Sequence, residues 1–161
     1  MTKQATIGTV SSRTHRVEDL LSAFAYELRY LVGKEAASAH PYLKGLEEAE
    51  AILESIEENS DWELDPENGE VATQCLEWFY ETLGELAPPY CYFGAHPGDG
   101  SDFGFWPDFD AIECEGLPRV EDASELPDGY VGEWLLINDH GNCTLFTRVT
   151  APEDVEGWSC V

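Results

Sequence analysis

A dense cluster of polar side chains between residues 94 and 110 could hold a metal ion. His96, Asp99 and Asp102 supply imidazole nitrogen and carboxylate oxygen, which are donors that divalent cations take from proteins. Their spacing matches neither an EF-hand loop nor a His-Glu-x-x-His zinc site. A tight glycine-containing loop, in which the aspartates accept backbone N–H bonds, explains the same residues. We therefore name His96, Asp99 and Asp102 as metal candidates and favour the structural interpretation.

Nucleophilic catalysis could occur at the turn over residues 138–142. His140 would act as a general base oriented by Asp139, with Cys91 or Cys143 as the nucleophile. Adjacent residues seldom form such a pair, because we expect their side chains to diverge in a turn, and turn formation alone explains the Asn-Asp-His-Gly segment. The sequence also lacks a phosphate-binding glycine loop and a G-x-S-x-G elbow. It therefore assigns no catalytic residue and no cofactor.

Two rows of glutamates are the strongest functional feature of the sequence. Within residues 47–58 and 70–85 they recur at helical spacings with no basic side chain between them. Like charges three or four residues apart cost a helix about 0.2–0.5 kcal/mol per pair, so solubility alone does not require this pattern. Successive carboxylates would lie about 5–6 Å apart, on the scale of the phosphates along a DNA strand. The predicted partner-binding residues are Glu47, Glu50, Glu54, Glu57, Glu58, Glu77 and Glu81.

The net charge of −25 is distributed unevenly along the 161 residues. Residues 1–46 carry six basic and four acidic side chains, whereas residues 47–161 carry 29 acidic side chains and only two basic ones. Such a surface repels nucleic acid and anionic membranes, which bind proteins largely through Lys and Arg. It attracts cationic surfaces. We therefore expect a basic protein surface as the partner, and no direct contact with nucleic acid or membrane.

The acidity of the chain could also arise without a partner. The glutamates could form a merely well-solvated surface, or the protein could be adapted to high salt. Adaptation to high salt predicts acidic residues over the whole surface, whereas residues 1–46 are slightly basic.

The elements that must position these residues fall into two halves. Apolar side chains three and four residues apart predict helices from Val17 to Gly33, from Pro41 to Asn59 and from Val71 to Pro88. Aromatic and β-branched runs between Gly, Pro and Asp clusters then predict strands, and the last two flank the 138–141 turn as an antiparallel hairpin. The predicted fold is α+β, with three N-terminal helices packed on a C-terminal antiparallel sheet of about four strands. The predicted strands span residues 90–93, 103–106, 130–137 and 142–149.

We expect residues 1–16 to form a flexible arm or an edge strand and residues 17–161 to form a single α+β domain. Its parts would be a helical half (17–88), a sheet half (90–150) and a short acidic tail (151–161). The sequence has no apolar run typical of a signal peptide or a membrane span, so we expect a soluble, cytoplasmic protein. Its five cysteines are an odd, widely spaced set without a C-x-x-C pair, which favours reduced, buried thiols.

In size and charge the chain resembles the small DNA-mimicking proteins that phages and plasmids direct against restriction and other defence systems. Separately, two segments resemble parts of small acidic proteins of bacteria and mobile elements to which no activity is attached. These segments are GAHPGDGSDFGFWP at 94–107 and NDHGN at 138–142. Resemblance to the mimic class implies a stoichiometric inhibitor without a cofactor that acts on a DNA- or RNA-binding protein.

Three hypotheses follow. The first is an acidic, non-catalytic binding protein whose glutamates on the second and third predicted helices occupy a basic groove. The second is a small metal- or ligand-binding enzyme that uses the His96, Asp99 and Asp102 loop with His140, which requires this loop and the 138–142 turn to meet at one pocket. The third is an acidic structural or accessory protein. A homodimer remains open under each hypothesis.

Overall fold

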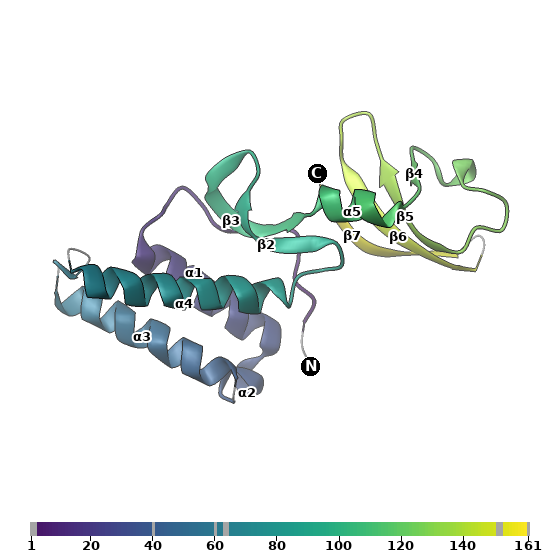
Figure 1. The fold of residues 1–161 in the computed structure, drawn as a ribbon. Helices are drawn as coiled ribbons and strands as arrows, with labels where there is room; N and C mark the ends of the chain where they lie inside the picture. Colours follow the sequence, from purple (N-terminus) through teal and green to yellow (C-terminus); the bar gives the residue numbers. More distant parts are fainter. Residues whose placement is uncertain (1–2, 40, 60, 63–64, 151–152, 161) are drawn as a thin grey trace.

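The computed structural model describes residues 3–39, 41–59, 61–62, 65–150 and 153–160. Figure 1 shows a helical bundle at one end of the molecule and a four-stranded sheet at the other, with a small three-stranded sheet between them. The α+β class predicted from the sequence is confirmed. No helix in the described ranges is long and apolar enough to cross a membrane.

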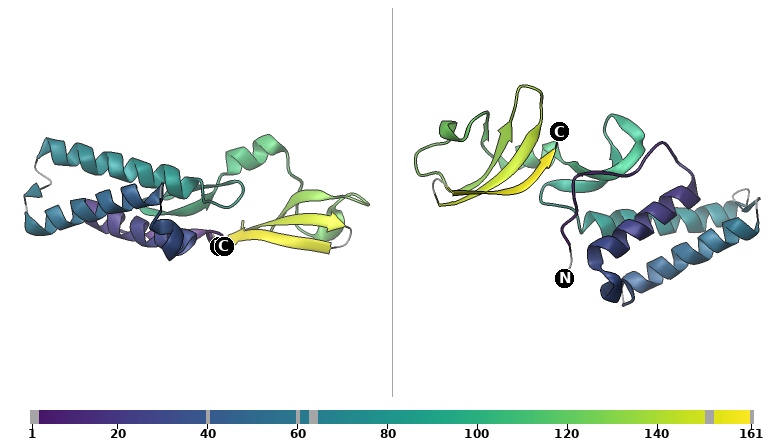
Figure 2. Two further views of the ribbon diagram at one scale, coloured as in Figure 1. Left: turned by 90° about the horizontal axis from the view of Figure 1, so that it is seen from below. Right: turned by 180° about the vertical axis from the view of Figure 1, so that it is seen from behind.

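Three long helices form the bundle: α1 (Val17–Val32), α3 (Tyr42–Glu58) and α4 (Pro66–Gly84). A short helix, α2 (Lys34–Ala37), follows α1 after Gly33, whose φ of 82° favours glycine. Helix α4 begins earlier than the apolar pattern predicts, because the Asp65 carboxylate caps it by accepting the Glu67 N–H at 2.9 Å. Seen from behind, α1 lies in front of α4 (Figure 2).

The helices pack on the small sheet through aromatic side chains. Phe24 of α1 is fully buried and meets Phe79 of α4 edge-on at a centroid distance of 6.2 Å. The same ring contacts Phe93 and Phe103 of the sheet at 5.0 and 6.1 Å. Such edge-to-face pairs contribute about 0.5–1.5 kcal/mol each beyond their buried area. One continuous core therefore joins the bundle to this sheet.

The small sheet is antiparallel, in the order β1-β3-β2. Its strands are β1 (Gly8–Ser11), β2 (Cys91–His96) and β3 (Asp99–Pro107). Strand β1 lies at its edge, within the N-terminal segment for which we considered an arm or an edge strand; residues 1–2 of that segment are outside the described residues.

The second sheet has the order β4-β5-β6-β7, with β4 and β5 parallel and the other pairs antiparallel. Helix α5 (Phe109–Glu115) connects the two sheets and buries Ile112 in the core of the second one. A short 3₁₀ helix, η2 (Ala123–Glu125), follows β4. The strands are β4 (Arg119–Val120), β5 (Gly132–Ile137), β6 (Cys143–Thr150) and β7 (Glu153–Cys160).

The predicted arrangement of the sheet half needs correction. The expected strands exist, but they belong to two sheets, and the helices pack on the smaller one instead of on a single four-stranded sheet. Residues 153–160, which we expected in an acidic tail, form β7 because Trp158 packs into the core of the second sheet. Residues 151, 152 and 161 of that segment lie outside the described residues.

Candidate functional site

Glu47, Glu54 and Glu58 form one row along α3. Their spacing of seven and four residues brings them to the same side of the helix. Ala49 and Ile52 are buried, and the row lies on the opposite side from them, away from the bundle core. All three carboxylates are exposed, so this row is available to a partner.

Glu50 and Glu57 lie on the flank of α3 that faces α1. Both are exposed, but Glu50 forms an ion pair with Arg29 of α1. An exposed pair of this kind contributes about 0–1 kcal/mol to stability, yet it neutralises the charge of Glu50. The seven predicted carboxylates therefore differ in how far their charge is neutralised. The tertiary structure pairs Glu50 with Arg29, and the spacing along the helix does not reveal this pair.

Helix α4 carries a second row with the same spacing. Glu70, Glu77 and Glu81 are exposed on the side opposite the buried Cys75 and Phe79. Helix α4 contains no lysine or arginine, and it lies beside α3 (Figure 1). The two rows, Glu47/Glu54/Glu58 and Glu70/Glu77/Glu81, are called the acidic rows below. They stand on adjacent helices.

The glutamates at the end of α3 do not stabilise that helix. Glu57 and Glu58 occupy the last turn of α3, where no basic residue is present. A carboxylate near the carbonyl end of a helix is unfavourable by about 0.3–1 kcal/mol, because it faces the negative end of the helix dipole. Local stability therefore does not explain why these positions are acidic.

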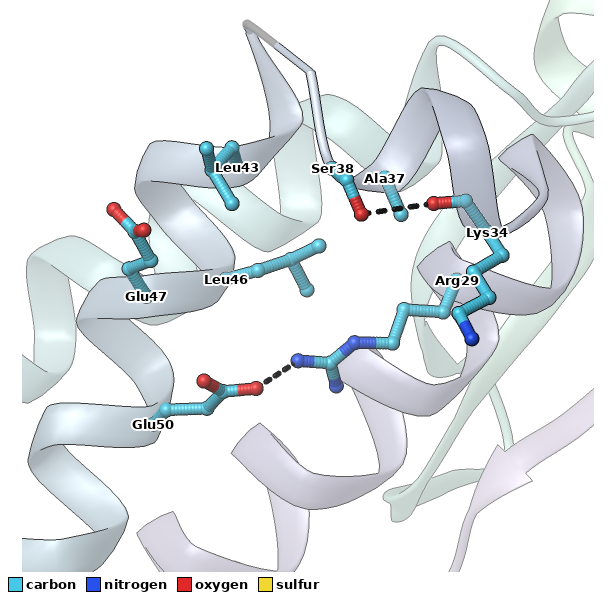
Figure 3. Close-up of a pocket in the computed structure, with 8 residues that line it drawn as sticks. All are labelled: Arg29, Lys34, Ala37, Ser38, Leu43, Leu46, Glu47 and Glu50. Carbon is cyan, nitrogen blue, oxygen red and sulfur yellow. Dashed lines mark hydrogen bonds and ion pairs between the residues drawn. The ribbon is translucent and has the colours of Figure 1, made fainter.

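A cavity of about 400 Å³ lies between α1, α2 and α3, at one end of the row on α3 (Figure 3). Arg29 and Glu50 reach toward each other across it, and Lys34 stands on the same side as Arg29. Basic and acidic side chains therefore meet at this cavity, and the negative charge around Glu47 is more nearly balanced than the charge around the middle of the row. The remaining lining residues are Ala37, Ser38, Leu43 and Leu46.

The side chains of the metal candidates are used to shape the β2–β3 turn. His96 Nδ1 accepts the Gly98 N–H at 3.0 Å, and Asp99 Oδ1 accepts both the N–H and the hydroxyl of Ser101, at 3.0 and 2.8 Å. These two bonds hold the pKa of Asp99 below its usual value. Asp102 accepts the Thr9 hydroxyl of β1 at 3.1 Å. Among the described residues, no three His, Cys, Asp or Glu side chains are placed to share a metal ion.

The His140 and Asp139 side chains approach each other instead of diverging as we expected. His140 Nε2 lies 3.6 Å from Asp139 Oδ1, with 81% and 83% of the two side chains exposed. The Asn138 carboxamide oxygen accepts the backbone N–H groups of His140 and Asn142, each at 3.0 Å, which fixes the turn. Cys143 is buried, with 1% of its surface exposed, and its pKa is raised, so it does not match the nucleophile this hypothesis needs.

A second cavity, of about 330 Å³, forms where the 94–107 segment meets the 138–142 turn. His96 and Pro97 line it from the β2–β3 turn and Gly141 from the hairpin turn, which is the meeting that the second hypothesis requires. Asp99, Asp102 and His140 do not line it, so the polar residues of that hypothesis are not gathered there. Its remaining lining residues are Ile7, Gly8, Trp106, Pro107, Phe109, Ser159 and Cys160.

Sequence reasoning missed Arg29 and Cys160 as parts of these two cavities. Arg29 belongs to the slightly basic N-terminal part, and Cys160 lies in the segment predicted to be a tail. Neither residue belongs to a local sequence motif. The residues that line each cavity with it come from distant parts of the chain, so their meeting cannot be read from the sequence. Comparisons with models of protein families, with curated proteins and with solved structures found no match to this chain.

Proposed function

We propose that this protein is an acidic, non-catalytic binding protein whose acidic rows dock into a basic groove on a nucleic-acid-binding protein. The observation that carries the proposal is the pair of exposed glutamate rows on the adjacent helices α3 and α4. Along each helix axis the carboxylates of a row are about 6–10 Å apart. A groove that binds phosphates through several Lys and Arg side chains can meet several of them at once.

The charge of the whole chain supports the same mode of binding. A net charge of −25 attracts a basic partner from a distance and accelerates encounter. Salt screens this attraction, since the Debye length is about 10 Å at 0.1 M and shorter above it. Binding should therefore be strongest at low ionic strength, and duplex DNA should compete for the same groove.

Affinity capture from a lysate of the source organism, at low and at high salt, tests the proposal with a matched pair of variants. Both variants remove four negative charges, so they differ only in where the charge is lost. We expect the wild type and the control to retain a nucleic-acid-binding protein that salt and duplex DNA release, and the acidic-row variant to lose it. The acidic-row variant is E47Q/E54Q/E77Q/E81Q, and the control is E113Q/E121Q/D128N/E156Q, at positions that are all exposed.

Equal capture by the two variants would overturn the proposal, because it would make net charge, and not the acidic rows, responsible for binding. Failure to capture any nucleic-acid-binding protein would count against it as well. The hypothesis of a structural or accessory protein predicts a different result, namely self-association by light scattering that both variants preserve. The hypothesis of a small metal- or ligand-binding enzyme has less support, because Asp99, Asp102 and His140 do not line the cavity that the 94–107 segment shares with the 138–142 turn.

A further inference from the structure

Cys143 and Cys160 face each other across the antiparallel strands β6 and β7. Directly opposite residues in such a pair have Cβ atoms about 4.5–5.5 Å apart, and a disulfide joins Cβ atoms about 3.5–4.5 Å apart. A small approach of the two strands would therefore allow a bond. The next pair along the strands is already in contact, since the hydroxyl oxygens of Thr144 and Ser159 are 3.0 Å apart.

Neither thiol is joined in a disulfide in the structure, and the two differ in accessibility. Cys143 is buried in the core of the second sheet, whereas Cys160 is half-buried and lines the 330 Å³ cavity. The Cys143 thiol beside the Cys160 sulfur stabilises the Cys160 thiolate and lowers the pKa of Cys160, although burial opposes the shift. Cys160 is therefore the more readily ionised thiol of the two, and the thiolate is the nucleophilic form.

Cys91 is the third thiol in this region, and it does not share these properties. Burial raises its pKa to about 12, so it stays protonated at neutral pH. Its S–H donates to the Pro89 carbonyl oxygen at 3.5 Å. The accessible Cys160 and its buried cross-strand neighbour Cys143 are thus the pair placed for exchange.

We propose that Cys160 and Cys143 are a redox-active dithiol, in which Cys160 attacks a low-molecular-weight disulfide that enters the cavity and Cys143 resolves the mixed disulfide. The cavity lies within the size range of small-ligand sites, and Trp106 and Phe109 give it apolar walls. This site is separate from the acidic rows and does not depend on the binding function proposed for them.

The two exchange steps balance. The Cys160 thiolate attacks one sulfur of RS–SR, and the S–S bond breaks, so that one RS⁻ leaves with the electron pair and Cys160–S–S–R remains. The mixed disulfide removes the Cys160 thiolate, whose contact and charge raise the pKa of Cys143, so Cys143 can then lose its proton to the released RS⁻. Its sulfur attacks the Cys160 sulfur and expels the second RS⁻, which takes a proton from water. Two protein thiols are oxidised to one disulfide, and the small disulfide is reduced to two thiols.

Oxidised glutathione is a suitable probe, in a Cys114→Ser background that removes the exposed thiol of α5. We expect mass spectrometry to show the loss of two hydrogen atoms without a lasting adduct, and peptide mapping to join residues 143 and 160. Adding Cys143→Ser should leave a stable mixed disulfide on Cys160, and adding Cys160→Ser should prevent any adduct. A lasting adduct in the protein that keeps both cysteines would overturn the proposal, as would a bond between other cysteines.

A second measurement needs no change in the pair and so does not depend on how the variants fold. The rate at which iodoacetamide labels Cys160 should level off at a pH below about 8.5, whereas an ordinary thiol becomes more reactive up to about pH 8.5. A Cys160 rate that keeps rising through pH 8.5 would show that Cys160 is not the nucleophile.

Discussion

Gly104 shows how a single residue type sets the contact between two strands. It is buried in β3, where Thr9 is its register partner in β1. A Cβ atom at this position would overlap the carbonyl oxygen of Gly8. A backbone neighbour cannot rotate away as a flexible side chain can, so the close approach of β1 to β3 requires glycine here.

We expect Gly104→Ala to lower the free energy of unfolding by about 1–3 kcal/mol, as overpacking of a buried site does. Gly84→Ala is the matched control, because a Cβ at the end of α4 meets no atom within 4 Å. That change should be neutral or should stabilise the protein by up to about 1 kcal/mol, since alanine favours a helix. Urea denaturation of both variants measures the difference. Similar stabilities would show that β1 does not constrain position 104.

At the scale of elements, β7 links the second sheet to the start of β2. Trp158 is only 6% exposed, and its indole N–H donates to the Pro89 carbonyl oxygen at 2.8 Å. The same strand supplies Cys160 to the cavity and Asp154 to the buried Arg148, whose guanidinium donates to that carboxylate at 2.7 and 2.9 Å. This strand is therefore part of the core and not a dispensable end.

Trp158→Ala should lower the free energy of unfolding by about 3–5 kcal/mol, because it removes a large buried ring and leaves a cavity. Val155→Ala in the same strand is the control, since Val155 is 58% exposed and its truncation should change stability by no more than about 0.5 kcal/mol. Thermal unfolding followed by circular dichroism compares the two. A Trp158→Ala protein as stable as the Val155→Ala protein would mean that β7 is not packed as described.

For the whole molecule, the dominant physical quantity is the negative charge. A net charge of −25 on 161 residues makes the folded state repel itself, and only eight basic side chains are available to offset it. The Arg29–Glu50 and Arg148–Asp154 pairs use two of them. Folding must therefore overcome a repulsion between carboxylates whose strength depends on the ionic strength of the solution as well as on the sequence.

Added NaCl should consequently raise the melting temperature, because it screens repulsion between exposed carboxylates. The E47Q/E54Q/E77Q/E81Q variant, with four fewer charges, should depend less steeply on salt and should melt higher at low salt. Melting curves across a NaCl series at constant pH measure both effects. A melting temperature that falls as NaCl is added, or that does not change, would contradict this account of the charge.

The sequence by itself determined most of the local structure. The apolar spacing predicts α1 and α3 almost to their ends, and the aromatic and β-branched runs locate β2, β3, β5 and β6. Local patterns suffice for these elements, since a helix or a strand shows its buried face within a few residues. Helix α5 was missed because it is short. Strand β7 was missed because its acidic residues hide the apolar alternation.

Only the tertiary structure decided which residues meet. The glutamate spacing was readable from the sequence, but the pairing of Glu50 with Arg29 depends on how α3 packs against α1. The division of the strands into two sheets and the pairing of Cys143 with Cys160 likewise depend on contacts between distant parts of the chain. Strand pairing and helix packing are set by the core as a whole, so no local spacing encodes them.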